Sequence, residues 1–352
     1  MFTNLITFIS LVYGKKRHDI SSQNWKLFLL TINFLLGSIL WVLLSTSDLL
    51  GLIHLDYIKQ IFLIAPLMVV PLALVSFEFR NVGSRVKMIW NMLLLSQAPA
   101  ALLTSISFLF HSGSWLAFCL VLPWLLFSAV LALLALNRLR HRGFMMLEEW
   151  AMDIACIYIF VGSLWLVASR LGLQLMGFGD VIVLLTAVHF HFAGFATAII
   201  LGLIGRMLKN FKDKKRLQQF YPFLAFFVLM GMPLVATGIT FRGHVEWFAV
   251  CIFALSMMVM AIFILKVCVV QAYDKSIAMM WKISAYSIFA GMGLALVYAW
   301  GLWRAKPILL IPDMVVTHGF INSIGFAASA LMAEYFQKMK RLVQSLKKEM
   351  AS

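Results

Sequence analysis

The sequence predicts an all-α integral membrane protein, built as a bundle of about ten transmembrane helices. Of its 352 residues, 63% are hydrophobic and 12% are charged, whereas a soluble domain carries about 25% charged residues. The apolar residues stand in uninterrupted runs of roughly 20, the length of a helix that crosses a bilayer. They do not alternate with polar residues as the strands of a membrane barrel do. Because lipid offers no hydrogen bonds, a backbone in such runs must be helical.

Ten such runs can be assigned in chain order. Since few residues lie outside them, residues 1–352 are expected to form a single polytopic transmembrane domain. Residues 1–13 are also apolar, but their basic cluster follows instead of preceding them, which does not fit a cleaved signal peptide. We expect an interfacial segment there. The predicted spans are about 27–46, 60–79, 88–110, 115–136, 151–169, 181–204, 220–240, 247–268, 283–303 and 308–334.

The distribution of charge supports the number of spans independently. An even number places both termini on one side of the membrane. With that side inside, all but five of the 29 Lys and Arg residues lie in inner segments, as the positive-inside rule predicts for termini in the cytoplasm. The net charge of +15 then follows from topology and anionic headgroups, and no nucleic-acid partner is expected. The five outer cations are Lys59, Arg170, Arg242, Arg304 and Lys306.

The inner segments are marked in chain order by basic residues. These are Lys26, then Arg80, Arg85 and Lys87, then Arg138, Arg140 and Arg142, then the run from Arg206 to Arg216, then Lys266, Lys275 and Lys282, and finally Lys338, Lys340, Arg341, Lys347 and Lys348. Two acids, Glu78 and Asp153, lie near the inner ends of their spans, and we expect them to pair with nearby Arg or Lys. Prolines within spans free a backbone carbonyl and can kink the helix. They are Pro66, Pro71, Pro99, Pro123 and Pro233.

Three histidines are predicted to lie near the middle of the membrane. His189 and His191 are about nine and eleven residues inward along the sixth span, and His318 about ten residues inward along the tenth, so all lie roughly 15 Å deep. Gln97 reaches a similar depth in the third span. A hydrocarbon core is about 30 Å thick, and an ionisable group at its centre is costly. A neutral imidazole there needs hydrogen-bond partners or a ligand.

The faces of the two helices limit how these residues can meet. His189 and His191 are about 200° apart on a helix of 3.6 residues per turn, so a regular helix cannot aim both at one metal ion. Small residues on both faces predict a central helix with protein on either side. In the tenth span, His318, Asn322, Gly325 and Ser329 share one face, which should point into the bundle. Candidate polar partners are Thr186, Thr317, Asp313 and Gln97.

The stretch LTAVHFHFAGF at 185–195, followed by THGFINSIGF at 317–326, resembles two signature segments of the YndJ-like family of bacterial membrane proteins. The resemblance implies a multi-pass helical protein of the bacterial cytoplasmic (inner) membrane. The family carries a loose transporter label without an established substrate or reaction. Some of its members carry an extra soluble domain, which we do not expect here.

Two functions remain open at this point, besides an accessory protein with structural histidines. In the first, the histidines bind a transition metal, haem or lipophilic substrate and carry out chemistry on it, with His189, His191, His318 and Asn322 as catalytic residues. The three histidines are then also the tentative metal ligands. In the second, a secondary transporter uses them as a substrate or proton site. In either case Thr186, Gln97, Thr317 and Asp313 are the predicted pathway residues. No nucleotide-binding motif occurs in the sequence, so no cofactor is specified, and membrane lipids are the expected partners.

Overall fold

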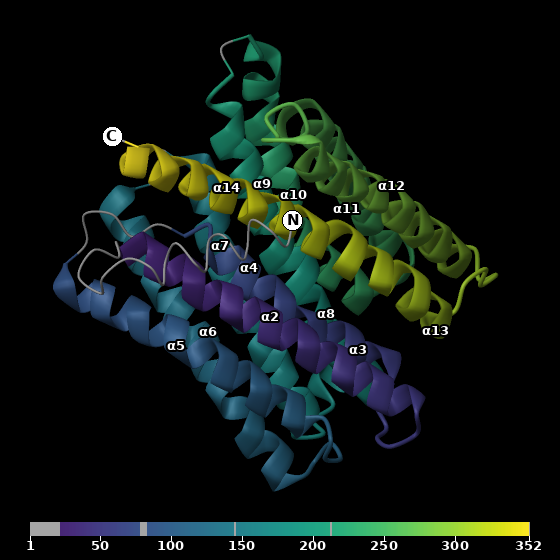
Figure 1. Cartoon of the computed structure of the whole chain (residues 1–352). Coiled ribbons are helices and arrows are strands. Elements are labelled where there is room, and N and C mark those ends of the chain that lie inside the picture. Colours follow the sequence, from purple (N-terminus) through teal and green to yellow (C-terminus); the bar gives the residue numbers. More distant parts are fainter. Residues whose placement is uncertain (1–21, 78–82, 144–145, 212, 352) are drawn as a thin grey trace.

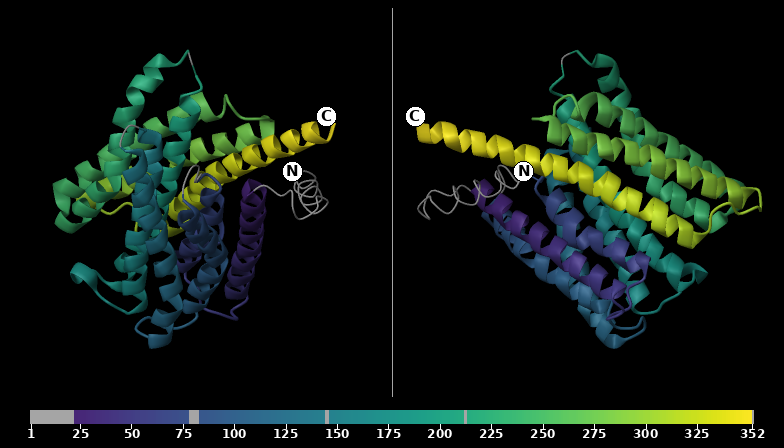
Figure 2. Two further views of the ribbon diagram at one scale, coloured as in Figure 1. Left: turned by 90° about the vertical axis from the view of Figure 1, so that its left-hand side faces the viewer. Right: turned by 45° about the vertical axis from the view of Figure 1, so that its right-hand side comes forward.

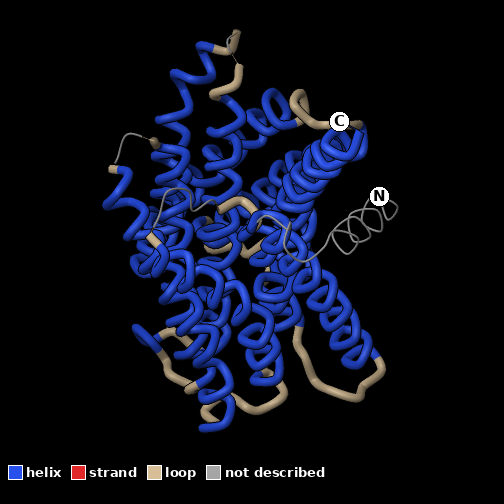
Figure 3. Tube along the Cα trace, turned by 60° about the vertical axis from the view of Figure 1, so that its left-hand side comes forward, coloured by secondary structure: helices blue, strands red, loops and turns tan. Residues whose placement is uncertain are grey.

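The described chain is a bundle of helices joined by short loops (Figures 1 and 3). The computed structural model describes residues 22–77, 83–143, 146–211 and 213–351. Within these ranges ten helices are long and apolar enough to cross a membrane, and no strand occurs. The predicted fold class and number of spans are therefore confirmed. The interfacial segment predicted at 1–13 and the predicted pairing of Glu78 lie outside the described residues.

The first five spanning helices follow the predicted ranges closely. The second of them is interrupted, because a π-helical turn, η1, separates α3 from α4. The elements are α2 (Ser22–Leu49), α3 (Tyr57–Ile64), η1 (Ala65–Val69), α4 (Val70–Leu74), α5 (Ser84–Ser107), α6 (Trp115–Arg142) and α7 (Leu147–Arg170).

The second five include three more interrupted helices. A short 3-10 turn, η2 (Leu175–Gly177), precedes them. They consist of α8 (Asp180–His189), π-helical η3 (Phe190–Ala196) and α9 (Thr197–Leu208), then α10 (Lys215–Phe241), then α11 (Gly243–Phe263) with π-helical η4 (Ile264–Cys268), then α12 (Lys275–Trp303), and last α13 (Ile311–Met314), π-helical η5 (Val315–Gly319) and η6 (Ile321–Ala328), and α14 (Ser329–Ala351).

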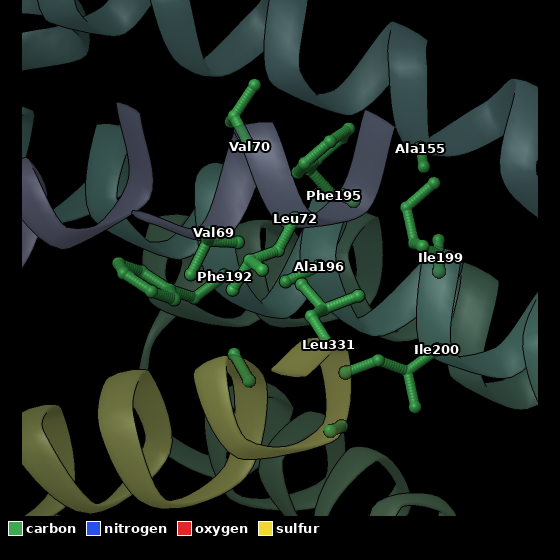
Figure 4. Packing of buried hydrophobic residues seen from close by; sticks show 14 of the residues in the cluster. Val69, Val70, Leu72, Ala155, Phe192, Phe195, Ala196, Ile199, Ile200 and Leu331 are labelled. Atoms are coloured by element: carbon green, nitrogen blue, oxygen red, sulfur yellow. The ribbon is translucent and has the colours of Figure 1, made fainter. Parts of the chain in front are cut away.

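Two of the interrupted helices form the centre of the bundle. The apolar window of Asp180–Leu208 is 89% buried and that of Tyr57–Leu74 is 78% buried, against 28–61% for the other spans. Helices α2, α5 and α6 lie on one side of them, and α10, α11 and α12 on the other (Figure 1). Phe192 and Phe195 of η3 pack with Val69 and Leu72 in the core between them (Figure 4). The sixth span is thus the predicted central helix.

The end of α4 is held by cations from three other helices. Lys26 of α2 and Lys338 of α14 donate to the carbonyl of Val75 at 3.3 and 3.2 Å, and Arg206 of α9 donates to the carbonyl of Ser76 at 2.7 Å. Carbonyls at a helix C-terminus lack intrahelical partners and carry partial negative charge. The cations that mark the inner side therefore also join the helices there.

The acidic residues of α7 are paired, as predicted for Asp153. Its carboxylate lies 2.6 Å from the Nη2 atom of Arg142 and 3.4 Å from the Nε atom of Arg138. Glu149 binds Arg138 at 2.6 Å and Arg206 at 2.8 Å. Because a buried charge without a partner is strongly destabilising, this network accounts for the acids without a catalytic role.

The last helix departs most from the prediction. Its apolar run was expected to end near 334, yet the helix continues to Ala351 and projects beyond the rest of the bundle (Figure 2). Its continuation is amphipathic: Tyr335, Met339, Val343 and Leu346 are buried at helical spacing. A hydropathy window detects apolar runs and misses such a helix.

Candidate functional site

Three of the π-helical segments meet in the middle of the bundle. Segments η1, η3 and η6 are in contact with one another, although they come from the second, sixth and tenth spans. A π-helical turn has one residue more per turn than the helix around it and is often found at functional sites. The predicted histidines lie in or beside these segments: His189 ends α8, His191 lies in η3, and His318 lies in η5, directly before η6. The candidate site therefore lies in this region.

His191 is completely buried, and both of its ring nitrogens are engaged. Its Nδ1 atom lies 2.8 Å from the carbonyl oxygen of Ala187, which can only accept, so Nδ1 carries the proton. Its Nε2 atom accepts from the indole N–H of Trp124 at 3.1 Å. The ring of Phe62 packs edge-on against it, with centroids 4.8 Å apart. No lone pair of this imidazole is left for a ligand.

His189 and His318 differ from His191, because each has one engaged nitrogen and is only half-buried. The Nδ1 atom of His189 donates to the carbonyl of Leu185 at 2.7 Å. That of His318 donates to the carbonyl of Gly291, on α12, at 2.8 Å. Within the described residues these are the hydrogen bonds of the two rings, and neither involves an Nε2 atom. In the neutral tautomer that these bonds fix, each Nε2 presents a free lone pair.

The same two histidines lie near each other. His189 directly precedes η3, His318 lies just before η6, and these two segments contact each other. They approach from separate helices, and α3 packs against both α8 and η5. We call His189 and His318 the histidine pair. The structure therefore brings together two of the three predicted histidines, and places His191 on the opposite side of its helix, as the 200° separation indicates.

The backbone around His318 is fixed by a close contact with α12. The side-chain amide of Asn322 donates to the carbonyl of His318 at 2.8 Å. A Cβ atom on Gly291 would lie 2.3 Å from that amide nitrogen, so only glycine allows this approach. Farther along, a Cβ on Gly325 would lie 2.3 Å from the hydroxyl of Ser287. The predicted small, polar face of the tenth span thus packs on α12, and Asn322 acts on the backbone of His318 instead of its ring.

The other predicted pathway residues bond elsewhere. The hydroxyls of Thr186 and Thr317 donate to carbonyls of their own helices, those of Ile182 and Asp313, at 2.7 Å each. Asp313 is exposed and its carboxylate accepts from the backbone of Leu310, as an acid at a helix N-terminus does. None of these bonds reaches the histidine pair.

Gln97 serves the interrupted second span. Its amide nitrogen donates to the carbonyl of Pro66 at 2.8 Å, and its oxygen accepts from Asn33 at 3.0 Å. Pro71 has no N–H, so the Pro66 carbonyl lacks the donor that would complete its π-helical bond. Gln97 supplies it. Sequence analysis places Gln97 by its depth alone, whereas its partner is a carbonyl of the neighbouring interrupted helix.

A metal ion would need more ligands than the histidine pair supplies. Among the described residues, no three His, Cys, Asp or Glu side chains gather closely enough to hold one. Because both nitrogens of His191 are engaged, the three histidines cannot all bind one metal ion. Neutral imidazoles that donate through Nδ1 to a carbonyl are nonetheless the form that binds ligands through Nε2. The arrangement suits an incoming polar group better than a metal held by protein alone.

Sequence reasoning missed two partners that define the site. Trp124, which donates to His191, is one of several aromatic residues in the fourth span, and the local sequence does not mark it as a partner of a histidine. Gly291, whose carbonyl holds His318, lies in the ninth span within the series Ser284, Ser287 and Gly291, spaced three and four residues apart. Such a stripe of small residues indicates a close helix contact, although it does not name the partner.

Comparison with known proteins gives a family and a membrane location. A curated relative, "Uncharacterized membrane protein YndJ" of Bacillus subtilis (strain 168), is 28% identical over 211 residues. The match covers 60% of this chain and 37% of the relative, so the chain spans little more than a third of that protein's length. No solved structure matches. A family model described as "YndJ-like protein" matches residues 60–326, which include all three histidines and Asn322. The chain is therefore a multi-pass membrane protein of the YndJ-like family.

Proposed function

We propose that this protein binds the polar end of a lipophilic substrate at the histidine pair, within the membrane. The observation that carries the proposal is the pair of free Nε2 lone pairs, one on His189 and one on His318, on neighbouring half-buried rings. In an apolar region an acceptor without a donor costs about 1–3 kcal/mol. A substrate that offers one O–H or N–H donor to each ring removes that cost at both.

The two imidazoles also have the chemistry to move a proton. A neutral histidine is a base, and a base within hydrogen-bond reach of an acidic proton can accept it. Each ring is oriented by a carbonyl at Nδ1, as catalytic imidazoles require. Gly291 and Asn322 then act as positioning residues for His318. This acid–base role requires that the substrate first binds at the histidine pair.

The test compares three purified proteins: wild type, the double variant His189→Phe/His318→Phe, and the control His54→Phe, which changes an exposed histidine in a loop. Each is extracted with organic solvent for mass spectrometry, and its metal content and absorption spectrum are measured. We expect a hydrophobic compound in wild type and control that is absent from the double variant. The same compounds in all three folded proteins would contradict the proposal. A stoichiometric metal lost only from the double variant would show that the pair binds metal instead.

A second candidate function, secondary transport, is favoured by the interrupted helices. Four of the ten spans in the described ranges contain π-helical segments, and transporters commonly bind substrates where midplane helices are broken. Single cysteines at 189 and 318, in a chain without Cys119, Cys156, Cys251 and Cys268, can be tested with a membrane-impermeant thiol reagent. Labelling from both sides of sealed vesicles supports alternating access. Labelling from one side only, under all conditions, contradicts it.

A further inference from the structure

A basic hollow opens where the start of α10 meets the end of η4, on the side of the membrane where the chain's cations collect. Its volume is about 720 Å³. It combines residues of the loop before α10, the first turns of α10 and one residue of η4. The lining residues are Asp213, Lys214, Lys215, Arg216, Leu217, Phe220 and Lys266.

The cations of this basic hollow lack acidic partners. Elsewhere on the same side, Arg142, Lys209 and Lys340 are each paired with a carboxylate. Within the described residues none of the four cations of the hollow forms an ion pair. Asp213, its one acid, cannot balance four positive charges. The hollow is therefore an unneutralised positive site.

One of the four cations is fixed in place. The ammonium of Lys214 donates to the carbonyl of Lys266 and lies 4.0 Å from the centroid of the Phe211 ring. These contacts tie the loop to the end of η4 and close one wall of the hollow. Lys215, Arg216 and Lys266 are exposed and free to turn toward a ligand.

The helix that forms the floor adds to the positive potential. The first turn of α10 contains no acid, and Lys214 makes no capping bond with its side chain. Cations at a helix N-terminus are unfavourable, since that end already carries partial positive charge. A bound anion would be attracted both to the helix N-terminus and to the cations of the hollow.

The lining is apolar on its other side. Leu217 and Phe220 follow the cations on α10, and Phe220 is 64% exposed. Phe223 and Phe226 continue the exposed aromatic surface along the same helix, toward the part of α10 that contacts lipid. A free phosphate ion would use only the cations, whereas a phospholipid would use both parts. We propose that the basic hollow binds an anionic phospholipid, with Lys215, Arg216 and Lys266 on its phosphate headgroup and an acyl chain along Phe220.

Native mass spectrometry tests this proposal, with phosphatidylglycerol as the probe and phosphatidylcholine of the same acyl chains as the reference. The variant Lys215→Gln/Arg216→Gln/Lys266→Gln is compared with wild type and with the control Arg85→Gln/Lys87→Gln/Lys347→Gln. The control removes three exposed charges from the same side. Each cation near an anionic lipid contributes about fivefold. We therefore expect at least tenfold weaker phosphatidylglycerol binding in the first variant, and a change below about twofold in the control.

A charge-preserving variant, Lys215→Arg/Arg216→Lys/Lys266→Arg, should retain the lipid, which separates loss of charge from loss of fold. Equal losses in the two glutamine variants would overturn the proposal, because they would indicate diffuse attraction. Unchanged binding in the first variant would overturn it as well. Displacement of the lipid by an equal concentration of inorganic phosphate would show a free-anion site and overturn the assignment to a lipid.

Discussion

The contrast between His191 and the histidine pair gives a prediction that needs no substrate. Replacing His191 by alanine removes a completely buried ring and leaves the indole N–H of Trp124 without an acceptor. A buried donor left without a partner costs about 1–3 kcal/mol. The lost edge contact with Phe62 adds about 0.5–1.5 kcal/mol, and the cavity adds more. We expect His191→Ala to destabilise the protein by about 3–5 kcal/mol.

His189→Ala is the matched comparison. It removes a half-buried ring whose one described hydrogen bond is to a carbonyl four residues earlier in the same helix. A single hydrogen bond contributes about 0.5–1.5 kcal/mol net, so the effect on stability should be much smaller. The midpoint of thermal unfolding in detergent, followed by circular dichroism, measures both variants against wild type.

A double substitution tests the stated cause. In His191→Leu/Trp124→Phe both polar partners are replaced by apolar groups, and no buried donor is left behind. Removing both partners is nearly neutral when shape is preserved, so this variant should be more stable than His191→Ala. If His191→Ala instead unfolds at the same temperature as wild type, the ring is not a structural member of the core. The conclusion that His191 is structural, in contrast to the histidine pair, would then be refuted.

The other predictions concern the support of His318 and one surface pair. Gly291→Ala should push Asn322 away from α12, break the bond between the His318 ring and the carbonyl of residue 291, and abolish substrate binding. Asn322→Leu should weaken binding less, because that bond remains. A binding assay with the extracted ligand would rank the two variants, and the reverse order would contradict the positioning role of Gly291. Burial raises the pKa of the Asp274 carboxyl, but Lys340 and two backbone N–H groups outweigh it and hold the pKa below its ordinary 3.8. Its contribution to stability is therefore present above about pH 4 and lost as the pH falls further. Asp274→Asn keeps the helix cap, so at pH 7 it should lower the free energy of unfolding by at most about 1 kcal/mol. The difference from wild type in the unfolding midpoint should shrink as the pH falls below 3.8 and vanish once the folded wild-type carboxyl is protonated.

The fold was predictable because its main determinant is local in sequence. Apolar runs of the right length specify spanning helices whatever surrounds them, and the described part of the chain contains ten, as expected. The side on which the termini lie still rests on the positive-inside rule. The interruptions were only partly predictable: Pro66 and Pro71 mark η1, whereas η3, η4, η5 and η6 contain no proline. No residue within these four segments marks the interruption as a proline does.

The candidate site was predictable in depth and facing but not in its partners. Counting residues placed the three histidines at one depth, and the helical repeat placed His189 and His191 on opposite faces. Neither count could indicate that His191 would contact Trp124 or that His189 would lie near His318. Those contacts depend on which helices are neighbours. Gln97 shows the same limit, since it lies at the predicted depth yet serves the carbonyl of Pro66.

Depth in the membrane therefore does not by itself separate a structural histidine from a functional one. The cost of burying an imidazole is the same in either case, and it is met by partners at both ring nitrogens. His191 has both partners in the protein, so a ligand would gain nothing there and would have to break the bond from Trp124. His189 and His318 each have a partner at Nδ1 alone, so binding at Nε2 removes a cost that the protein leaves standing. The reason to look for a ligand at the histidine pair is the unbonded Nε2 atom of each ring, and not the depth of the ring in the membrane.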